Sequence, residues 1–378
     1  MIALALALTF LSAFAVTALL VPPVIRLCAR RGWMVQPGPR RVHRRPTATV
    51  GGLAMIGGLL CALALSFALS GLDPGLRRSP YELLRVGLLL MGAGLIAAIS
   101  FVDDLRELPA LPRLLIHFLA ALIAVGPYLW DHTLYPDALG APTEARGIIL
   151  TAFNFPFIDQ IHLHNLSPWL AIGATLLWIV GMQNMVNWAD GLDGLAAGVT
   201  LIAATVLALH TLRLSPPQYT VALLPLALAG ACAGFLLFNF HPARVFMGDV
   251  GAMTLGYLLG VSAIIGGAKL ATALLVLGVP LIDMGWLVVV RTLRGRSAGA
   301  ASRAGRDNLH IRLLDLGFSQ RQIVCFYYTL SVAFGCVGLL DFFTPLMKLA
   351  ALGVLGAIVL SVLIYASTAQ VRGAAGKA

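Results

Sequence analysis

Long apolar runs, separated by short polar connections, dominate the chain. A helix needs about 20 mainly apolar residues to cross a bilayer, and these runs have that length and are apolar on every face. They occupy residues 2–28, 50–71, 83–102, 112–130, 166–183, 192–210, 218–238, 250–266, 269–291, 322–341 and 345–366. The pattern predicts an all-α, polytopic membrane protein with about eleven transmembrane helices.

The stretch 131–165 interrupts this pattern. It contains Pro136, Pro142 and Pro156 and few charges, and proline removes a helical hydrogen bond. We expect a loop here, with a short re-entrant or interfacial piece near 147–158. The chain as a whole is expected to form one integral membrane domain over residues 1–367, followed by a short cytoplasmic tail at 368–378.

The composition excludes soluble alternatives. Hydrophobic residues make up 59% of the 378 residues even without the 39 glycines, and charged residues make up 11%. A soluble domain has about 45–50% apolar residues with glycine included, and about 25% charged residues. The five cysteines form no CxxC pair, which disfavours a thiolate metal site or a redox motif. Because no soluble domain is present to carry the arginines, we expect no nucleic acid among the partners.

The distribution of arginine predicts the orientation in the membrane. The connections 29–49 and 292–321 are rich in arginine, whereas the alternate connections are poorer. Cytoplasmic connections carry an excess of Lys and Arg, so these two segments are expected in the cytoplasm. The N-terminus then lies outside and the C-terminus inside a cell inner (cytoplasmic) membrane. The net charge of +10 largely reflects this asymmetry, and it also favours contact with anionic membrane lipids.

The few acidic residues gather on one side of the predicted membrane. Ionisable groups at or within a membrane are costly and are by default candidates for function. In the predicted orientation, five carboxylates at span ends face the cytoplasm and one more lies inside a span: Asp103, Asp104, Asp190, Asp193 and Asp249, and then Asp283. We therefore expect a shared polar site at the cytoplasmic surface. The adjacent Asp103 and Asp104 cannot point the same way on a helix, so their roles should differ.

The local spacing sharpens this expectation. A polar residue recurs at every third position from Asn184 through Asn187 and Asp190 to Asp193, which lines up one helix face. Carboxylate and amide oxygens suit Mg²⁺, or Mn²⁺, and do not suit Zn²⁺. The connection 292–321 brings arginines and His310 to the same side, and these can neutralise phosphate charge. The residues alone thus indicate a Mg²⁺-dependent enzyme that handles a phosphorylated substrate at the cytoplasmic membrane surface.

Four motifs, in order along the chain, carry a resemblance to a known family. Residues 41–54 read R-V-H-R-R-P-T-A-T-V-G-G-L-A, and residues 101–105 read F-V-D-D-L. Residues 184–196 read N-M-V-N-W-A-D-G-L-D-G-L-A, and residues 242–249 read P-A-R-V-F-M-G-D. The region from about 35 to 322 therefore resembles the polyprenyl-phosphate N-acetylhexosamine-1-phosphate transferases (glycosyltransferase family 4). The similarity is to the glycan-initiating branch, which is related to the phospho-N-acetylmuramoyl-pentapeptide transferases.

One motif departs from the family pattern. Residues 307–314 read D-N-L-H-I-R-L-L, where the glycan-initiating branch has roughly D-H-L-H-H-R-L-L. Asn308 and Ile311 thus replace two histidines, whereas His310 remains. The phosphate or sugar contacts that the family makes through these two histidines are therefore not expected from this loop. The pentapeptide branch is disfavoured because its three histidines and the Phe-Glu that follows them are absent.

The resemblance implies a phosphotransferase reaction. A polyprenyl phosphate, such as undecaprenyl phosphate, attacks the β-phosphorus of a UDP-N-acetylhexosamine, and UMP leaves. The product starts a lipid-linked cell-envelope glycan, of which lipopolysaccharide O-antigen is one example. The reaction depends on Mg²⁺, and a homodimer is compatible with the resemblance.

The resemblance also implies roles for individual residues. The metal ligands are Asp249 and Asn187; Asp103 or Asp104 orients or deprotonates the lipid phosphate; Arg113 contacts that phosphate; Asp190 and Asp193 shape the nucleotide site; His310 and Arg312 contact the diphosphate or sugar; Asn184 and His43 bind substrate. The second pKa of a phosphate is near 6, so the lipid phosphate is mostly a dianion at neutral pH and needs little help from a base. For this reason we favour a positioning role for Asp103 and Asp104.

Two other classes of protein remain as alternatives. An intramembrane prenyltransferase is suggested by Asp103-Asp-Leu-Arg-Glu107, which resembles a DDxxD pyrophosphate motif but ends in Glu and has no second copy. A carboxylate-coupled transporter would need carboxylates near the membrane midplane and a repeat between the halves of the chain. No convincing repeat is present, and only Asp283 lies clearly within a span.

Overall fold

The computed structural model describes residues 1–37, 45–136, 142–155, 158–265, 273, 276–293, 308–339 and 345–375. Within these ranges, ten helices are long and apolar enough to cross a membrane. They are α1 (Ile2–Arg31), α2 (Gly52–Leu69), α3 (Pro80–Arg106), α4 (Ala110–Val125, with its span continued through η2, Gly126–Leu129), α6 (Pro168–Ala189), α7 (Leu195–Leu212), α8 (Tyr219–Asn239), α9 (Gly248–Ile265), α14 (Gln320–Leu339) and α15 (Pro345–Ala375). An eleventh apolar helix, α11 (Gly278–Leu293), is shorter. These helices coincide with the apolar runs of the sequence, so the prediction of an all-α polytopic membrane protein is confirmed.

Short elements connect these helices. They are the single-turn helices α5 (Leu163–Leu166), η1 (Pro74–Leu76) and η2 (Gly126–Leu129), and the two-turn helix α13 (Leu309–Asp315). At the C-terminus, α15 continues as helix to Ala375, past the end of the last apolar run.

The strands among the described residues form three antiparallel hairpins. They are β1 (Met34–Val35) with β2 (Thr47–Ala48), β3 (Leu134–Pro136) with β4 (Pro142–Ala145), and β5 (Ala152–Phe155) with β6 (Ile158–His162). The expected loop over 131–165, with its short re-entrant or interfacial piece near 147–158, therefore contains more regular structure than predicted, because two hairpins and α5 lie there. Between the hairpins, Ile148 to Leu150 are buried, and the Ile148 N–H donates to the Ala124 carbonyl of α4 at 2.9 Å. This piece packs on the end of α4.

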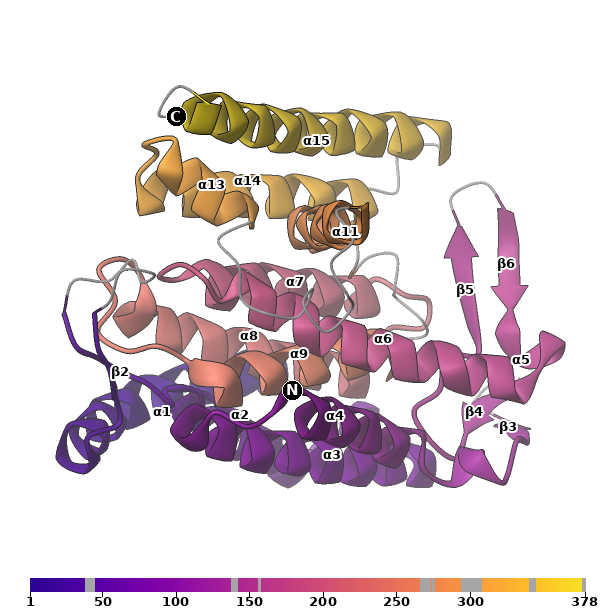
Figure 1. The fold of residues 1–378 in the computed structure, drawn as a ribbon. Helices are drawn as coiled ribbons and strands as arrows, with labels where there is room; N and C mark the ends of the chain where they lie inside the picture. The colour runs from indigo at the N-terminus through magenta and orange to yellow at the C-terminus, as the bar shows by residue number, and fades with distance from the viewer. Residues whose placement is uncertain are drawn as a thin grey trace.

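The helices lie in layers that follow chain order, with α1–α4 on one side, α6–α9 in the middle and α11–α15 on the other side (Figure 1). The central helix is α9, which packs against α2, α3, α6, α7 and α8. Every residue from Val250 to Ile264 is buried. Small residues make this packing close: a Cβ at Gly256 would lie 2.6 Å from the Cα of Gln183 in α6. The position of α9 is thus set by neighbours on all sides.

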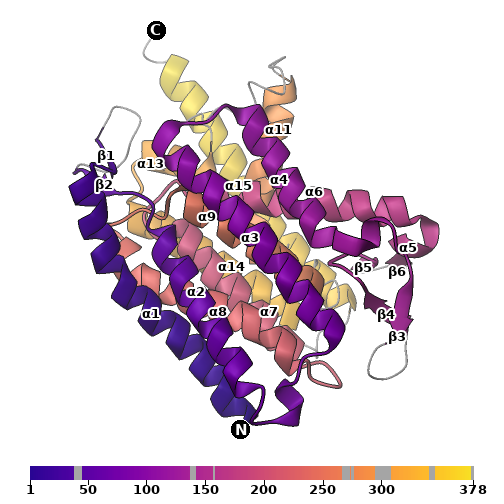
Figure 2. The same ribbon diagram turned by 90° about the horizontal axis from the view of Figure 1, so that it is seen from below.

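One end of the bundle brings together the motif segments described for the sequence. There the Gly52 N–H at the start of α2 donates to the Met247 carbonyl just before α9, at 2.9 Å. The Gly194 N–H before α7 donates to the Asn239 side chain at the end of α8, at 3.1 Å. We call this the motif end of the bundle. Figure 2 shows the N-terminus at the opposite end from the C-terminal part of α15.

Candidate active site

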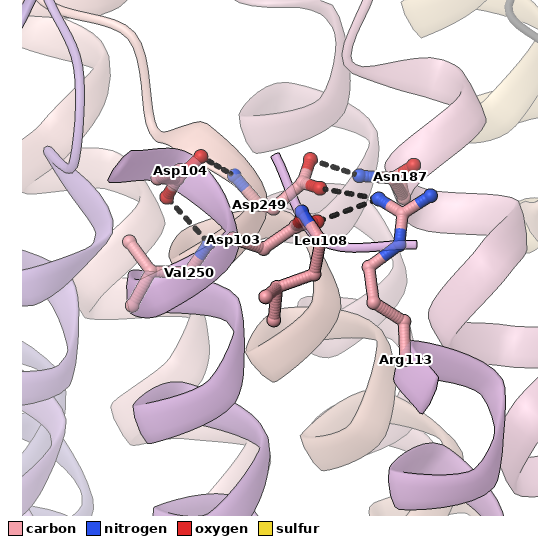
Figure 3. Close-up of polar contacts among 7 residues, drawn as sticks. All are labelled: Asp103, Asp104, Leu108, Arg113, Asn187, Asp249 and Val250. Carbon is pink, nitrogen blue, oxygen red and sulfur yellow. Dashed lines mark hydrogen bonds and ion pairs between the residues drawn. The ribbon is translucent and has the colours of Figure 1, made fainter. Parts of the chain in front are cut away.

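Two carboxylates and one guanidinium meet at the motif end. Asp103, in the last turn of α3, accepts a hydrogen bond from the Leu108 N–H and another from Arg113 Nη1, both at 2.6 Å. Arg113, in the first turn of α4, also lies 3.4 Å from Asp249 Oδ2 in the first turn of α9. Figure 3 shows the Arg113 guanidinium contacting both carboxylates from one side. The side chains of Arg113 and Asp249 remain about one-third exposed, at 33% and 31%, so the cluster is open to a ligand.

Asp104 points away from this cluster and caps α9. One of its oxygens accepts the Asp249 N–H at 2.8 Å, and the other accepts the Val250 N–H at 3.0 Å. These donors belong to the first turn of α9 and have no partner within the helix. Gly248 is part of this arrangement, because its φ is +71° and a Cβ there would lie 2.5 Å from the Asp104 carboxylate. Asp104 therefore determines where Asp249 lies, and the expected division of roles between Asp103 and Asp104 has a structural basis (Figure 3).

The amides of α6 have two different environments. Asn187 donates its side-chain N–H to Asp249 Oδ1 at 2.8 Å and so joins the cluster. Asn184 instead donates to the Val180 carbonyl one turn earlier on its own helix. The expectation of one polar helix face from Asn184 to Asp193 was wrong beyond Asn187, because α6 ends at Ala189. The last two of these polar residues lie in the turn before α7.

The turn between α6 and α7 holds Asp190 and Asp193 in separate positions. Burial, and then the negative charges of Asp249, Asp104 and Asp193, raise the pKa of Asp190 to about 8. A carboxyl group with this pKa is mostly protonated at pH 7, and a cation bound beside it would favour its charged form. Asp193 turns toward the connection between α8 and α9. Its Oδ2 accepts His241 Nδ1–H at 2.7 Å and the Ala243 N–H at 3.1 Å.

Backbone contacts join motifs that are far apart in sequence. The Phe246 N–H donates to the Ala48 carbonyl at 2.8 Å, and the Gly51 N–H donates to the Phe246 carbonyl at 2.9 Å. Asn239 accepts from the Gly194 N–H and donates to the Val245 carbonyl at 2.8 Å. The first, third and fourth motifs therefore form one hydrogen-bonded unit. Sequence reasoning assigned no role to Asn239, although a polar side chain at the end of an apolar run was a signal for it.

Two histidines near the cluster also had no assigned role. His241 pairs with Asp193 as described, and the Pro-Ala motif that follows it was the available signal. His117 lies four residues after Arg113 on the same face of α4 and lines a crevice with Asp103, Arg113 and Asp249. The signal for His117 was its spacing of four residues from Arg113, which places the two side chains on the same helix face.

The α13 helix brings His310 and Arg312 to different surroundings. His310 is 2% exposed and lies against the turn before α7, since a Cβ at Gly191 would be 2.1 Å from its Nε2. Burial lowers the pKa of His310 to about 4, so its imidazole is neutral at pH 7. Arg312 is also buried and donates to the Ser367 hydroxyl of α15, which directs it away from the carboxylate cluster. His43 lies outside the described residues.

The cluster supplies oxygen ligands of the kind that magnesium prefers. Asp103 and Asp249 approach closely enough for one guanidinium nitrogen to contact both, and the Asn187 amide is beside Asp249. Mg²⁺ is usually bound by one or two carboxylates together with waters and substrate phosphates. In the part of the chain that the structure describes, no group of three or more His, Cys, Asp and Glu side chains is arranged to hold a metal ion. The two carboxylates and the amide nonetheless fit an ion that takes its other ligands from substrate and water.

A bundle of apolar helices with such a cluster at one end defines a polytopic membrane protein with a polar site suited to phosphate groups. Residues 86–267 match the family model described as glycosyl transferase family 4. The decaprenyl-phosphate N-acetylglucosaminephosphotransferase of Mycobacterium tuberculosis is 34% identical over 383 residues, covering 94% of this chain and 87% of that relative. The chain therefore belongs to glycosyl transferase family 4, and it is an enzyme of that family.

Two further relatives represent two branches. The probable undecaprenyl-phosphate N-acetylglucosaminyl 1-phosphate transferase of Bacillus subtilis is 29% identical over 326 residues, covering 84% of this chain and 80% of the relative. The phospho-N-acetylmuramoyl-pentapeptide-transferase of Desulforudis audaxviator is 31% identical over 340 residues, covering 86% and 95%. The resemblance inferred from the four motifs is confirmed at the level of the family.

Proposed function

We propose that the protein transfers N-acetylhexosamine-1-phosphate, with N-acetylglucosamine as the first candidate sugar, from a UDP-sugar to a polyprenyl phosphate. An oxygen of the lipid phosphate forms a bond to the β-phosphorus of the UDP-sugar, the bond to the UMP oxygen breaks, and UMP leaves. The observation that carries this proposal is the cluster of Asp103, Arg113, Asn187 and Asp249. The names of the relatives support a polyprenyl phosphate as acceptor.

Each residue of the cluster has a task in this reaction. Arg113 carries a fixed positive charge at the open surface of the cluster and binds the lipid phosphate. Asp103 holds the Arg113 guanidinium in place through the bond at 2.6 Å. The lipid phosphate is mostly a dianion at neutral pH, so the reaction needs positioning and charge neutralisation more than a strong base.

Mg²⁺ is proposed as the cofactor, with Asp249 and Asn187 as its ligands from the protein and Asp103 beside them. The ion would neutralise the charge of the diphosphate and of the departing UMP. The Asp104 cap holds Asp249, and the Asn187 amide orients the same carboxylate. Such supporting contacts are important because a misplaced ligand weakens metal binding.

The activity is tested by UMP release. We expect purified protein in detergent to release UMP from a UDP-N-acetylhexosamine only when polyprenyl phosphate is present, and to stop when EDTA removes the divalent ion. Restoring Mg²⁺ should restore the rate, whereas Ca²⁺ serves as a control of equal charge. In a parallel assay with a prenyl diphosphate, release of pyrophosphate without any release of UMP from the UDP-sugar would favour the prenyltransferase alternative and contradict the proposal.

We further propose that the motif end of the bundle faces the cytoplasm of a bacterial inner membrane and that the product starts a lipid-linked cell-envelope glycan. The arginine-rich connections 29–49 and 292–321 support this orientation. Each of these connections adjoins the motif end of the bundle. The first contains β2, whose Ala48 pairs with Val245 just before α9. The second leads into α14, whose first residue, Gln320, accepts the Asp193 N–H.

Cysteine labelling tests this orientation. The background replaces the exposed Cys61, Cys325 and Cys336 by Ser. In intact cells we expect Leu72→Cys to react with an impermeant thiol reagent, and Ser319→Cys to react only after permeabilisation, because the two positions are exposed at opposite ends of the bundle. The reverse pattern would contradict the proposed orientation.

A further inference from the structure

Asp283 is a carboxylate inside an apolar helix, and it has a specific partner. It lies in α11 and is 6% exposed. Both of its oxygens accept the backbone N–H of Leu309, at 2.9 and 3.0 Å. A buried carboxylate in a membrane span is costly unless it is compensated. The first N–H groups of α13 offer this compensation, because they have no partner within the helix and carry the positive end of its dipole.

The helix that Asp283 caps is also held against two other elements, α6 and α15. Asn308, just before α13, donates its side-chain N–H to the Trp188 carbonyl near the end of α6, at 3.5 Å. At the other end, Arg312 donates to Ser367 of α15. His310 and Asp283 line one cavity together with Asn308 and Tyr327. Asp283 thus acts on a helix whose two ends are already attached to α6 and α15.

The next residue after the capped amide is His310, which contacts the turn before α7. Its Nε2 fills the space that a Cβ at Gly191 would need, at 2.1 Å. Gly191 directly follows Asp190, which lies close enough to Asp249 and Asp104 for their negative charges to raise its pKa. A shift of α13 would therefore move the His310 imidazole away from the turn that contains Asp190 and Gly191.

From these contacts we propose that Asp283 is a positioning residue, which holds α13 so that the His310 imidazole supports the Asp190–Gly194 turn of the donor site. The proposal rests on the proposed function, since it treats this turn as part of the sugar-nucleotide site. It also gives a reason for a carboxylate within a span, which the motifs of the sequence do not explain.

The closing experiment compares Asp283→Ala with His310→Ala and with the double variant. We expect each single variant to raise the KM for the UDP-sugar or lower kcat by about tenfold or more, with the KM for polyprenyl phosphate unchanged. The double variant should be no worse than His310→Ala within about twofold, because both changes remove the same support. Effects that multiply, or an Asp283→Ala enzyme with wild-type kinetics, would overturn the proposal. A wild-type protein that releases no UMP would instead contradict the proposed function.

The matched control is Glu82→Gln. Glu82 also caps a helix, since it accepts the Ser79 N–H, and it accepts the Thr220 hydroxyl at the end of the bundle far from the cluster. We expect this change to affect thermal stability without changing the KM for the UDP-sugar. An equal change in KM for Glu82→Gln and Asp283→Ala would show a general structural effect and overturn the proposal.

Two further readouts keep the proposal testable if Asp283→Ala has low activity or folds poorly. Amide hydrogen exchange of residues 308–316 should be slow in the wild type and faster in Asp283→Asn, whichever reaction the protein catalyses. Gly191→Ala tests the same contact from the other side: we expect a loss of activity that is not increased by adding His310→Ala. Unchanged exchange in Asp283→Asn, or an active Gly191→Ala enzyme, would contradict the proposal.

Discussion

Replacing Asp249 by Asn should remove nearly all turnover while the protein still inserts into the membrane. The change keeps the shape of the side chain, but removes the charge that faces Arg113 and the proposed Mg²⁺. Disturbing residues that only support a metal ligand costs about 10–100-fold in affinity or activity, so loss of the ligand charge itself should cost more. UMP release per mole of membrane-inserted protein measures this effect.

A suitable control for this variant is Glu107→Gln. Glu107 is an exposed carboxylate directly after α3, at the same end of the bundle. The control makes the same change of charge and should leave turnover close to that of the wild type. Wild-type turnover in Asp249→Asn would contradict the assignment of Asp249 to the metal site.

The second large effect is expected for Asp104→Ala, through the position of α9. Both backbone donors that Asp104 accepts belong to the first turn of this helix, and Asp249 is one of them. Loss of an N-cap typically destabilises a protein by about 0.5–2 kcal/mol. We expect lower thermal stability in detergent together with a loss of turnover of at least about tenfold, which corresponds to roughly 1.4 kcal/mol of activation free energy.

The comparison with Asp104→Asn separates positioning from direct chemistry. Asn keeps one acceptor oxygen, so it should recover part of both the stability and the rate. Asp103→Asn should differ, because Asp103 contacts Arg113 and not the start of α9. If Asp104→Ala lost turnover at unchanged stability, Asp104 would act directly on the substrate and its role as a cap would not explain the rate.

Much of the fold could be predicted from the sequence because the bilayer restricts the choices. A chain segment in hydrocarbon must satisfy its own backbone hydrogen bonds, so each apolar run of sufficient length becomes a helix. The run at 269–291 illustrates the limit of this reasoning. It contains most of the helix α11, whose buried carboxylate Asp283 has a partner 26 residues away that no local pattern indicates.

The gathering of Asp103, Asn187 and Asp249 at one end of the bundle also followed from the sequence. Charges are costly in the membrane and therefore occur at the ends of spans, and alternate connections lie on the same side. The hairpins between residues 131 and 165 could not be foreseen in this way, because that segment contains proline and lacks the regular apolar period on which the other expectations were based.

The sequence by itself determined the helices, their order and the end of the bundle at which the polar residues meet, since these depend on the solvent that each segment requires. Only the tertiary structure decided what each polar side chain does there. Asp103 and Asp104 are neighbours in the chain, yet one binds Arg113 and the other caps α9. Arg312 faces α15 instead of the cluster. The physical reason is that successive side chains on a helix point in directions about 100° apart, so their partners depend on which helices pack beside them.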